Sequence, residues 1–176
     1  MPEKNSHCSW CGKRFSNGEP WPRTCGGCGN RSYLNPLPVA VVLAPVGNGV
    51  VVVRRNIEPA KGTLTLPGGY IDAGESWQEG ARRELWEETG IAINADDLTL
   101  YEVANGLDQT LVIIGLARWQ PQEVLIPFVT DETQEVLLIH EPRELGFPLH
   151  TMIVARYFEG LSSSPQRGEV GRGGRD

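Results

Sequence analysis

The chain has 176 residues and a formal net charge of −6, with 40% hydrophobic and 22% charged residues. This composition supplies one globular core and leaves a little over for a small module or tail. The longest apolar stretch, residues 39–46, contains Pro45 and is far shorter than the roughly 18 residues that a membrane helix needs. These values exclude a membrane protein, a collagen-like fibre and a wholly disordered chain.

The charge is unevenly distributed along the chain. Five basic and two acidic residues give residues 1–36 a charge of +3, whereas 11 basic and 20 acidic residues give the remainder a charge of −9. Nucleic-acid binding without sequence preference requires clustered Lys and Arg, so nucleic acid is not expected as the main partner of the acidic part. The first residues contain no apolar segment of the kind that directs secretion, and we expect a cytoplasmic protein.

All four cysteines lie in residues 1–36, in two pairs of the form C-x-x-C separated by 13 residues: Cys8, Cys11, Cys25 and Cys28. This spacing suits a tetrahedral Zn²⁺ site of four thiolates and resembles that of zinc ribbons. Two disulfides are the alternative, but they are typical of secreted chains. We expect zinc to supply the folding energy of this small module.

The aromatic residues of the same module allow two interpretations. They either pack its small core or contact RNA or a nucleotide, and the first is favoured because aromatics in zinc ribbons usually pack the core. The residues in question are Trp10, Phe15, Trp21 and Tyr33.

Residues 37–160 contain nearly all the strand and helix patterns. Two β-branched runs over 39–44 and 50–55, joined by Pro-Val-Gly-Asn-Gly, predict a hairpin. A helix is predicted over 76–89, because Ser76 and Glu79 form a capping box and Gly90 follows as the C-terminal glycine. Further strands are predicted over 63–66, 98–104, 110–119 and 135–139, a closing helix over 149–158, and a disordered tail over 161–176. The order predicts an α/β (α+β) fold with a mixed sheet covered on both faces.

Three glutamates of the predicted helix lie within an arc of about 100° at the edge of its buried stripe. They are Glu84, Glu87 and Glu88. Converging carboxylates repel one another unless a cation neutralises them, and oxygen ligands favour Mg²⁺ or Mn²⁺ over zinc. A solvated Glu-rich helix face is the alternative, and the spacing alone does not decide between the two.

The segment around this helix matches the Nudix box, G-x5-E-x7-R-E-U-x-E-E-x-G-U, where U is aliphatic, at every fixed position. The matching residues are Gly69, Glu75, Arg83, Glu84, Leu85, Glu87, Glu88, Gly90 and Ile91. Residues 37–160 therefore resemble a Nudix hydrolase domain, which implies an α/β/α sandwich with a mixed sheet. The full arrangement predicted is a zinc ribbon over 1–36, a Nudix domain over 37–160 and a tail over 161–176.

The resemblance implies roles for the matching residues. Glu84, Glu87 and Glu88, with a backbone carbonyl near Gly69, would be ligands of Mg²⁺ or Mn²⁺, and Glu75 would pair with Arg83 and orient the helix. The family often adds an acidic residue from a later loop as ligand or base. Glu132 is the candidate here, with Asp131 and Glu135 as rivals and an exposed loop acid as the alternative.

The implied activity is metal-dependent hydrolysis of a pyrophosphate bond in a nucleoside diphosphate linked to a group X, such as ADP-ribose, NADH or a related nucleotide. The catalytic residues would be Glu84, Glu87, Glu88 and Glu132. Arg54 and Arg55 are candidates to bind the substrate's phosphates, with a plain surface location as the alternative. The competing hypotheses are a Nudix-derived nucleotide sensor without turnover and a module that the ribbon directs to RNA.

The arrangement of a zinc ribbon before a Nudix domain resembles the NADH pyrophosphatases. Those enzymes carry an SQPWPFP-type segment after the box, whereas this chain has Tyr101-Glu-Val-Ala-Asn-Gly-Leu-Asp-Gln109 there. The sequence therefore does not decide which small-molecule nucleotide is the substrate. Homodimers are frequent in the family, although no residue here indicates one.

Overall fold

A computed structural model describes residues 4–163 of the chain. The chain divides into two compact units, Met1–Leu37 and Pro38–Asp176, and each is described by itself below. The predicted tail begins at residue 161, but the last helix continues to Ser163, and the remainder of that tail lies outside the described residues.

The first unit is built from two turns with the same backbone pattern. In the first, the Gly12 N–H donates to Cys8 O (2.9 Å) and the Cys8 N–H to Lys13 O (2.8 Å). In the second, the Gly29 N–H donates to Cys25 O (2.8 Å), and the Cys25 N–H to the carbonyl five residues on (2.9 Å). Gly12 and Gly29 have φ of 73° and 75°, a left-handed conformation that favours glycine. Two short antiparallel strands complete the unit, β1 (Arg23–Thr24) and β2 (Arg31–Ser32).

The strands of the second unit form two four-stranded sheets. One has the order β7-β3-β9-β8; its strands are β3 (Leu37–Leu43), β7 (Gly68–Tyr70), β8 (Leu98–Asn105) and β9 (Thr110–Ala117). The other has the order β10-β5-β4, with β6 also paired to β5; its strands are β4 (Pro45–Val46), β5 (Gly49–Arg55), β6 (Leu64–Thr65) and β10 (Thr133–Ile139).

The predicted hairpin between residues 39–44 and 50–55 is wrong, because β3 and β5 belong to different sheets. The strand that turns back onto β5 is the short β4, where Pro45 pairs with Val50 and Val46 with Gly49. Pro45 has no N–H to continue the pairing of β3, and the chain changes sheets at this point. Both runs are apolar on both faces because each of their sheets is covered on both sides.

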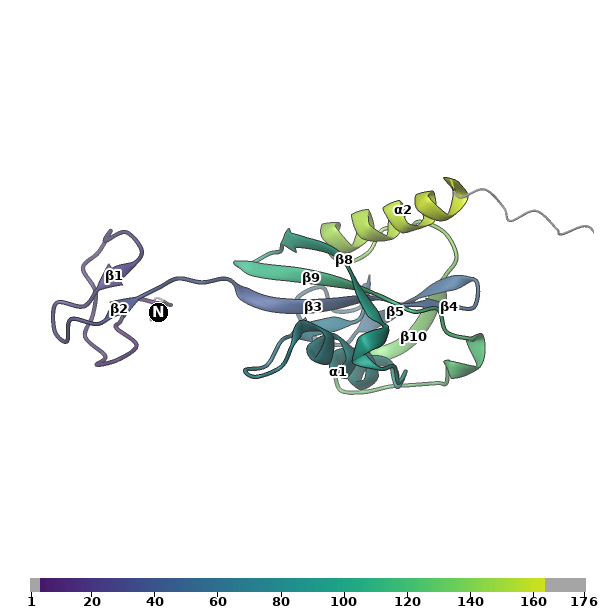
Figure 1. The fold of residues 1–176 in the computed structure, drawn as a ribbon, viewed down its shortest axis with the longest axis horizontal. Helices are drawn as coiled ribbons and strands as arrows, with labels where there is room; N and C mark the ends of the chain where they lie inside the picture. The colour runs from purple at the N-terminus through teal and green to yellow at the C-terminus, as the bar shows by residue number, and fades with distance from the viewer. Residues whose placement is uncertain (1–3, 164–176) are drawn as a thin grey trace, which may run out of the picture. The chain divides into compact units, whose positions relative to one another are not determined.

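Two helices cover the sheets on opposite sides, α1 (Trp77–Thr89) and α2 (Pro148–Ser163) (Figure 1). The predicted α/β sandwich is therefore confirmed, with the strands divided between two sheets. Two short 3₁₀ turns, η1 (Ala95–Asp97) and η2 (Gln122–Val124), precede β8 and follow β9. One apolar cluster includes Leu43, Val52 and Ile153, and a second includes Val51 and Leu85.

Local sequence fixes the ends of α1, as predicted. The Ser76 Oγ accepts from the Glu79 N–H (3.2 Å), while the Glu79 carboxylate accepts from the Ser76 N–H (2.7 Å). Gly90 ends the helix at φ 73° and donates its N–H to Trp86 O (2.8 Å). A Cβ at residue 90 would lie 2.8 Å from the Phe128 ring, so glycine is needed for space as well as for φ.

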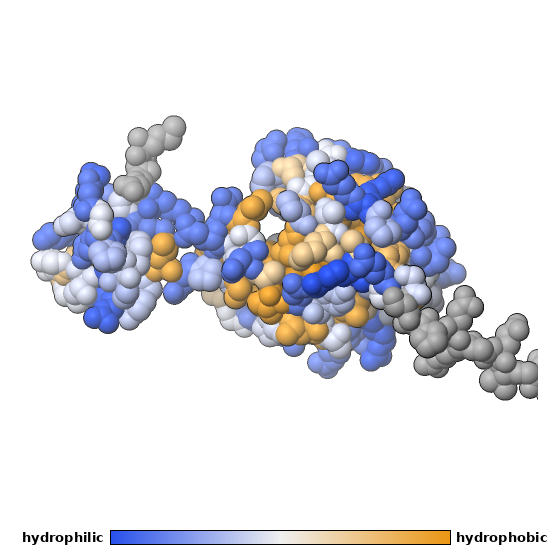
Figure 2. Space-filling view, turned by 90° about the horizontal axis from the view of Figure 1, so that it is seen from above, coloured by the Kyte–Doolittle hydropathy of each residue, from blue (hydrophilic) through white to orange (hydrophobic). Residues whose placement is uncertain are grey.

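The surface retains apolar areas between its polar residues (Figure 2). Exposed apolar side chains of the second unit include Tyr70, Trp86, Leu100, Trp119 and Val129. Among residues 4–163, no helix combines the length and apolar character that crossing a membrane requires.

Candidate active site

The carboxylates of α1 meet the backbone of β7. One oxygen of Glu88, a side chain only 4% exposed, accepts a hydrogen bond from the Gly68 N–H (2.8 Å). A Cβ at residue 69 would lie 2.5 Å from the carboxyl carbon of Glu84. The absence of a side chain at Gly69 therefore allows the glutamate to approach the loop backbone, and this contact explains the glycine at that position of the box.

Arg83 holds the glutamates on the outer side of this cluster. Its guanidinium makes a two-point contact with Glu75, with Nε–Oε1 at 2.8 Å and Nη2–Oε2 at 2.9 Å. Its Nη1 also donates to Glu84 (2.6 Å) and Glu87 (3.1 Å), and Nη2 donates to Tyr70 O (2.9 Å). The planar guanidinium of Arg83 thus connects Tyr70 and Glu75, which precede α1, with two carboxylates of α1.

The pKa shifts of these groups follow from burial and charge. Burial raises the pKa of Glu88 to about 8, against the opposing effect of the Gly68 N–H. Burial also raises the pKa of Glu84, although Arg83 acts in the opposite direction. The hydrogen bonds from Arg83 lower the pKa of Glu75 to about 2. Burial thus disfavours the charged forms of Glu84 and Glu88, and a bound cation would favour them.

The donor set of this cluster suits a hard divalent cation such as Mg²⁺ or Mn²⁺, because it consists of carboxylate oxygens. The oxygens are nevertheless not gathered around one point. Among the described residues, the four cysteines alone bring three or more His, Cys, Asp or Glu ligand atoms within 4.8 Å of one another. Arg83 and the Gly68 N–H instead hold the three glutamates at their present positions.

The three acidic candidates, Asp131 and Glu132 before β10 and Glu135 within it, have different surroundings. Glu135 pairs with Arg54, with Nε–Oε1 at 2.5 Å, and Asp131 accepts a hydrogen bond at its main-chain oxygen from Asn56. Glu132 is exposed, and its charge raises the pKa of both Glu84 and Glu88. The structure therefore brings Glu132 near the buried carboxyls of α1.

The two arginines at the end of β5 face opposite sides of the sheet, as neighbours on a strand do. Arg54 is engaged by Glu135 and also donates from Nη1 to Gly62 O (3.0 Å). The charge of Arg55 lowers the pKa of Glu88, and its guanidinium carbon lies 5.5 Å from the centre of the Phe147 ring. Only the second arginine thus lies beside the acidic cluster.

His150 was not singled out from the sequence. It lies in the first turns of α2, is 7% exposed, and its Nδ1 accepts a hydrogen bond from the Leu66 N–H (3.2 Å), just before the loop that carries Gly68. Burial and the charge of Arg55 lower its pKa to about 4, so the ring is neutral at pH 7. The signal in the sequence was weak: a histidine next to Thr151 at the start of the otherwise mostly apolar closing helix.

The four cysteines of the first unit form a second cluster. Their sulfurs pair across the two turns, with Cys8–Cys28 at 3.7 Å and Cys11–Cys25 at 3.6 Å, and all four lie within 4.8 Å of one another. Sulfurs placed about 2.3 Å from a central zinc ion are about 3.8 Å apart in a regular tetrahedron. The cysteines are not joined as disulfides, and their spacing fits a four-thiolate metal site.

The backbone of the turns favours thiolates at Cys8 and Cys25, whereas the neighbouring thiols of Cys28 and Cys25 raise the pKa of Cys11 to about 11. The N–H groups of Cys28 and Gly27 lower the pKa of the Cys25 thiol to about 6, and those of Cys11 and Trp10 lower the pKa of Cys8.

The aromatic residues of the first unit separate into two groups. Phe15 packs with Cys8 and Cys25 and meets the Trp21 ring edge to face, with 6.0 Å between ring centres. Trp10 and Tyr33 are exposed instead, at 70% and 62%.

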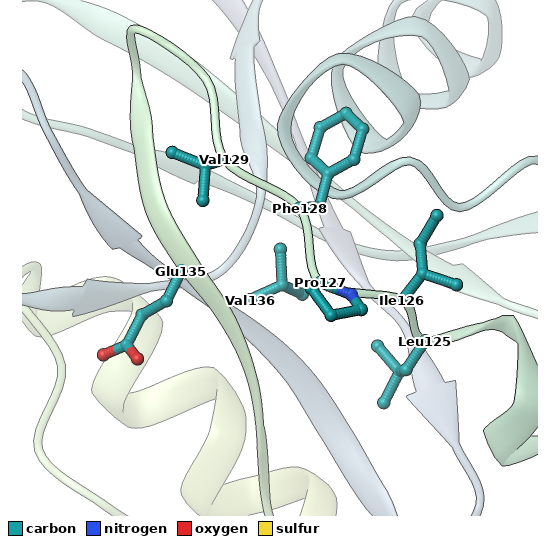
Figure 3. A pocket seen from close by; sticks show the side chains of 7 residues that line it. All are labelled: Leu125, Ile126, Pro127, Phe128, Val129, Glu135 and Val136. Atoms are coloured by element: carbon teal, nitrogen blue, oxygen red, sulfur yellow. The ribbon is translucent and has the colours of Figure 1, made fainter.

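One hollow of the second unit lies between the loop of residues 125–129 and β10. It has a volume of about 380 Å³ and is lined by Leu125, Ile126, Pro127, Phe128, Val129, Glu135 and Val136. Figure 3 shows the loop of residues 125–129 beside β10, with the Glu135 side chain directed away from that loop. No residue of the α1 cluster lines it.

Comparison with known proteins agrees with this geometry. Residues 35–116 match the model of the NUDIX domain family. The Nudix hydrolase from Nitrosomonas europaea has a similar structure, with a TM-score of 0.66, 25% identity and coverage of 88% of this chain and 90% of that one.

Two curated relatives carry names that describe an activity. An ADP-ribose pyrophosphatase from Methanocaldococcus jannaschii is 36% identical over 61 residues, which are 35% of this chain and 36% of that protein. An NAD-capped RNA hydrolase NudC from Edwardsiella ictaluri is 23% identical over 145 residues, 81% of this chain and 50% of that protein. The matched parts are thus half or less of these relatives' lengths.

Proposed function

Because the chain belongs to the Nudix superfamily, with its NUDIX domain over residues 35–116, we propose that it hydrolyses a pyrophosphate bond in a nucleoside diphosphate linked to a second group. The observation that carries this proposal is the cluster of Glu84, Glu87 and Glu88 against the glycines of β7, with Arg83 tying two of the carboxylates to the loop.

Glu84, Glu87, Glu88 and the backbone carbonyl of Gly69 would hold Mg²⁺ or Mn²⁺. The raised pKa values of Glu84 and Glu88 support this assignment, because a cation favours the charged carboxylates that burial disfavours. When bound, such a cation offsets phosphate charge and makes water a stronger acid.

The remaining residues have distinct tasks in the proposed reaction. Arg83 and Glu75 fix α1 relative to the loop that precedes it. Arg55 offers a guanidinium beside the cluster for one of these phosphates. Glu132, the exposed carboxylate nearest the cluster in the loop before β10, takes the proton from the attacking water.

Arg54 has the weaker case for binding substrate. Its ion pair with Glu135 and its hydrogen bond to Gly62 O hold it in the sheet and the following loop. We therefore assign phosphate binding to Arg55 and a structural role to Arg54.

For the cysteine cluster we propose a structural Zn²⁺ ion. The sulfur spacing, the backbone N–H groups that stabilise thiolates at Cys8 and Cys25, and a small apolar core built on Phe15 in the described part of this unit support it. A cytoplasmic location and a homodimer stay predictions.

The names of the two relatives support ADP-ribose and NAD-type nucleotides as substrates. The NudC name also favours a second candidate, in which the nucleotide forms the end of an RNA, and the exposed Trp10 and Tyr33 give such a strand aromatic surfaces for stacking.

The test is a product-release assay with ADP-ribose, NADH, diadenosine polyphosphates, nucleotide sugars, nucleoside triphosphates and an NAD-capped RNA, each with Mg²⁺ or Mn²⁺. We expect metal-dependent cleavage of one class, and a loss of kcat of about 100-fold or more in Glu87→Gln. Glu123→Gln, a change of an exposed glutamate in η2, is the matched control. Tight binding of a nucleotide without turnover would instead identify a sensor, and full activity of Glu87→Gln would overturn the assigned metal site.

A further inference from the structure

Asn56, the residue directly after β5, makes three hydrogen bonds to the turn that carries Glu132. Its main-chain N–H donates to Glu132 O (2.8 Å), and its side-chain Nδ2 donates to Asp131 O (3.0 Å). Its Oδ1 accepts from the Gln134 Nε2 (3.4 Å). One residue, through its main chain and its side chain, thus connects the end of β5 with three residues of a segment that lies 75 to 78 positions further along the chain.

The turn has its own internal hydrogen bonds, which set its shape. The Thr130 Oγ1 accepts from the N–H groups of Glu132 (3.2 Å) and Thr133 (3.0 Å), and the Thr130 N–H donates to Thr133 O (2.9 Å). These bonds define how the chain turns but not where the turn lies relative to the sheet. That placement comes from the contacts with Asn56.

The pairing of β10 with β5 is irregular at the same place. Thr133 pairs with Arg55 and Glu135 with Arg54, so the register shifts between Thr133 and Glu135. The shift directs Glu135 to Arg54 and leaves Glu132 just outside the strand, where the main-chain bond from the Asn56 N–H extends the ladder by one step and the Asn56 side chain adds contacts on either side of it. The Asn56 side chain therefore provides contacts that the ladder does not.

The exposed Glu132 directly precedes β10, a strand that contacts α1, and its charge acts on Glu84 and Glu88 of that helix. Within residues 4–163 its carboxylate has no hydrogen-bond or ion-pair partner that would orient it, and the position of its main chain decides which points the carboxylate can reach. A displacement of about 1 Å at a reacting group can cost on the order of 100-fold in rate. The contacts of Asn56 are thus placed where a small shift has a large effect.

We propose that Asn56 is a positioning residue for Glu132, holding the turn of residues 131–134 so that the carboxylate reaches the attacking water. This inference rests on the proposed function, in which Glu132 accepts the proton of that water. Asn56 itself touches neither substrate nor reacting atoms and acts through Glu132.

The experiment is a double-mutant cycle in the full-length chain with the substrate that the release assay identifies. Asn56→Ala removes both side-chain hydrogen bonds, whereas Asn56→Asp keeps the acceptor but cannot donate to Asp131 O. We expect each to lower kcat by about 10-fold with KM changed less than about 2-fold, as loss of a positioned base predicts. In a Glu132→Gln background the same changes should lower kcat by less than about 2-fold.

A readout that needs neither metal nor substrate accompanies the cycle. Amide hydrogen exchange of Thr130 and Thr133 should become faster in Asn56→Ala, because the turn loses its side-chain contacts with residue 56 and keeps only main-chain bonds to β5, while exchange in α1 stays unchanged. Gln120→Ala is the matched control, since its Nε2 also donates to a main-chain carbonyl (Arg118 O, 3.2 Å) in a loop beyond the other end of β5. It should leave kcat unchanged.

The outcomes separate the inference from the function on which it rests. Equal losses of kcat from Asn56→Ala in both backgrounds, or no loss in the native background, overturn the positioning role while the hydrolase stands. Full activity of Glu132→Gln beside an inactive Glu87→Gln overturns it as well. If the native protein turns over no nucleotide with metal, both the proposed function and this inference are wrong.

Discussion

The four cysteines and the three glutamates are both candidate metal ligands, yet they depend on the fold in different ways. The cysteine sulfurs come from two turns with the same backbone pattern and already lie within 4.8 Å of one another. The glutamates come from a single helix, but Arg83 and the Gly68 N–H hold them without closing them around one point.

The difference shows that carboxylates close together in the sequence do not by themselves form a site for Mg²⁺ or Mn²⁺. A C-x-x-C turn brings its own sulfurs together, and two such turns complete a soft-ligand set. The glutamates instead depend on β7, on the end of β5 and on the loop before β10, three segments that only the tertiary structure brings to α1. Damage to the cysteine cluster should therefore stay local, and damage to the carboxylate cluster should come from distant residues.

The largest expected effect is the unfolding of the first unit when the proposed zinc ion cannot bind. Cys25→Ser should abolish zinc binding and unfold residues 4–37, because metal binding supplies about 10–16 kcal/mol in zinc-finger peptides. Zinc content and the dispersion of NMR signals measure this, with Ser9→Ala in the first turn as control. Loss of the signals of residues 38–163 as well would contradict the view that the effect is local.

The next effect concerns His150, far along the chain from the loop it supports. Its pKa is about 4 in the folded protein, against about 6.5 for an unperturbed histidine. Between these values the unfolded chain binds a proton at this histidine that the folded protein does not, so the contribution of His150 to the free energy of unfolding should fall as pH drops through this window, whereas the raised pKa of Glu88 acts in the opposite direction. The total loss is about 3 kcal/mol by pH 4, and this contribution to stability is complete above pH 6.5.

Urea unfolding at several pH values measures this loss. In His150→Asn the amide oxygen still accepts from the Leu66 N–H but does not titrate, so the dependence on pH in this window should flatten. His140→Asn changes an exposed histidine and serves as the control. An unchanged pH dependence in His150→Asn would show that other groups cause the acid sensitivity.

A smaller effect is expected from Arg83→Lys, which keeps the charge but not the fork. The lysine cannot hold Glu75, Glu84 and Glu87 at once, so metal affinity and kcat should fall by about 10- to 100-fold. Titration calorimetry with Mn²⁺ and the release assay measure the two quantities. Arg82→Lys, at the neighbouring exposed position of α1, should change neither, and equal losses in both variants would speak against a specific role of the fork.

The smallest effect is expected from a change at the start of α1, whose cap depends only on residues close together in the sequence. Ser76→Ala removes the hydroxyl that accepts from the Glu79 N–H and should lower the free energy of unfolding by about 1 kcal/mol. The turnover number should stay within a factor of about 2, because the cap lies at the helix end away from Glu88. Thermal unfolding and kcat decide this; a tenfold loss of kcat would show that the cap also positions the carboxylates.

Features with a local cause were predicted well from the sequence. The capping box and Gly90 define α1 where expected, because their hydrogen bonds join residues three or four apart. The predicted hairpin between residues 39–44 and 50–55 failed, since two apolar runs can pair with any neighbouring strand. Pro45 sends the chain into the other sheet, and only the competition among all strands decides the pairing.

The same distinction holds for the site. The helical arc of Glu84, Glu87 and Glu88 followed from their spacing, but its placement at the edge of the buried stripe understated the burial of Glu88, which is 4% exposed. β7 covers this carboxylate, and its Gly68 N–H donates a hydrogen bond to it in the interior. No sequence motif predicts the contacts of Asn56 and His150, because each joins segments more than 70 residues apart.

The sequence by itself determined the ligand types, the two C-x-x-C turns and the helix that presents three carboxylates, since these follow from spacing and short-range hydrogen bonds. The tertiary structure alone decided which arginine of β5 lies beside the carboxylates, which loop acid approaches them and how deeply Glu88 is buried. Desolvation and long-range charge act through space, and the order of residues along the chain does not specify the distances on which they depend.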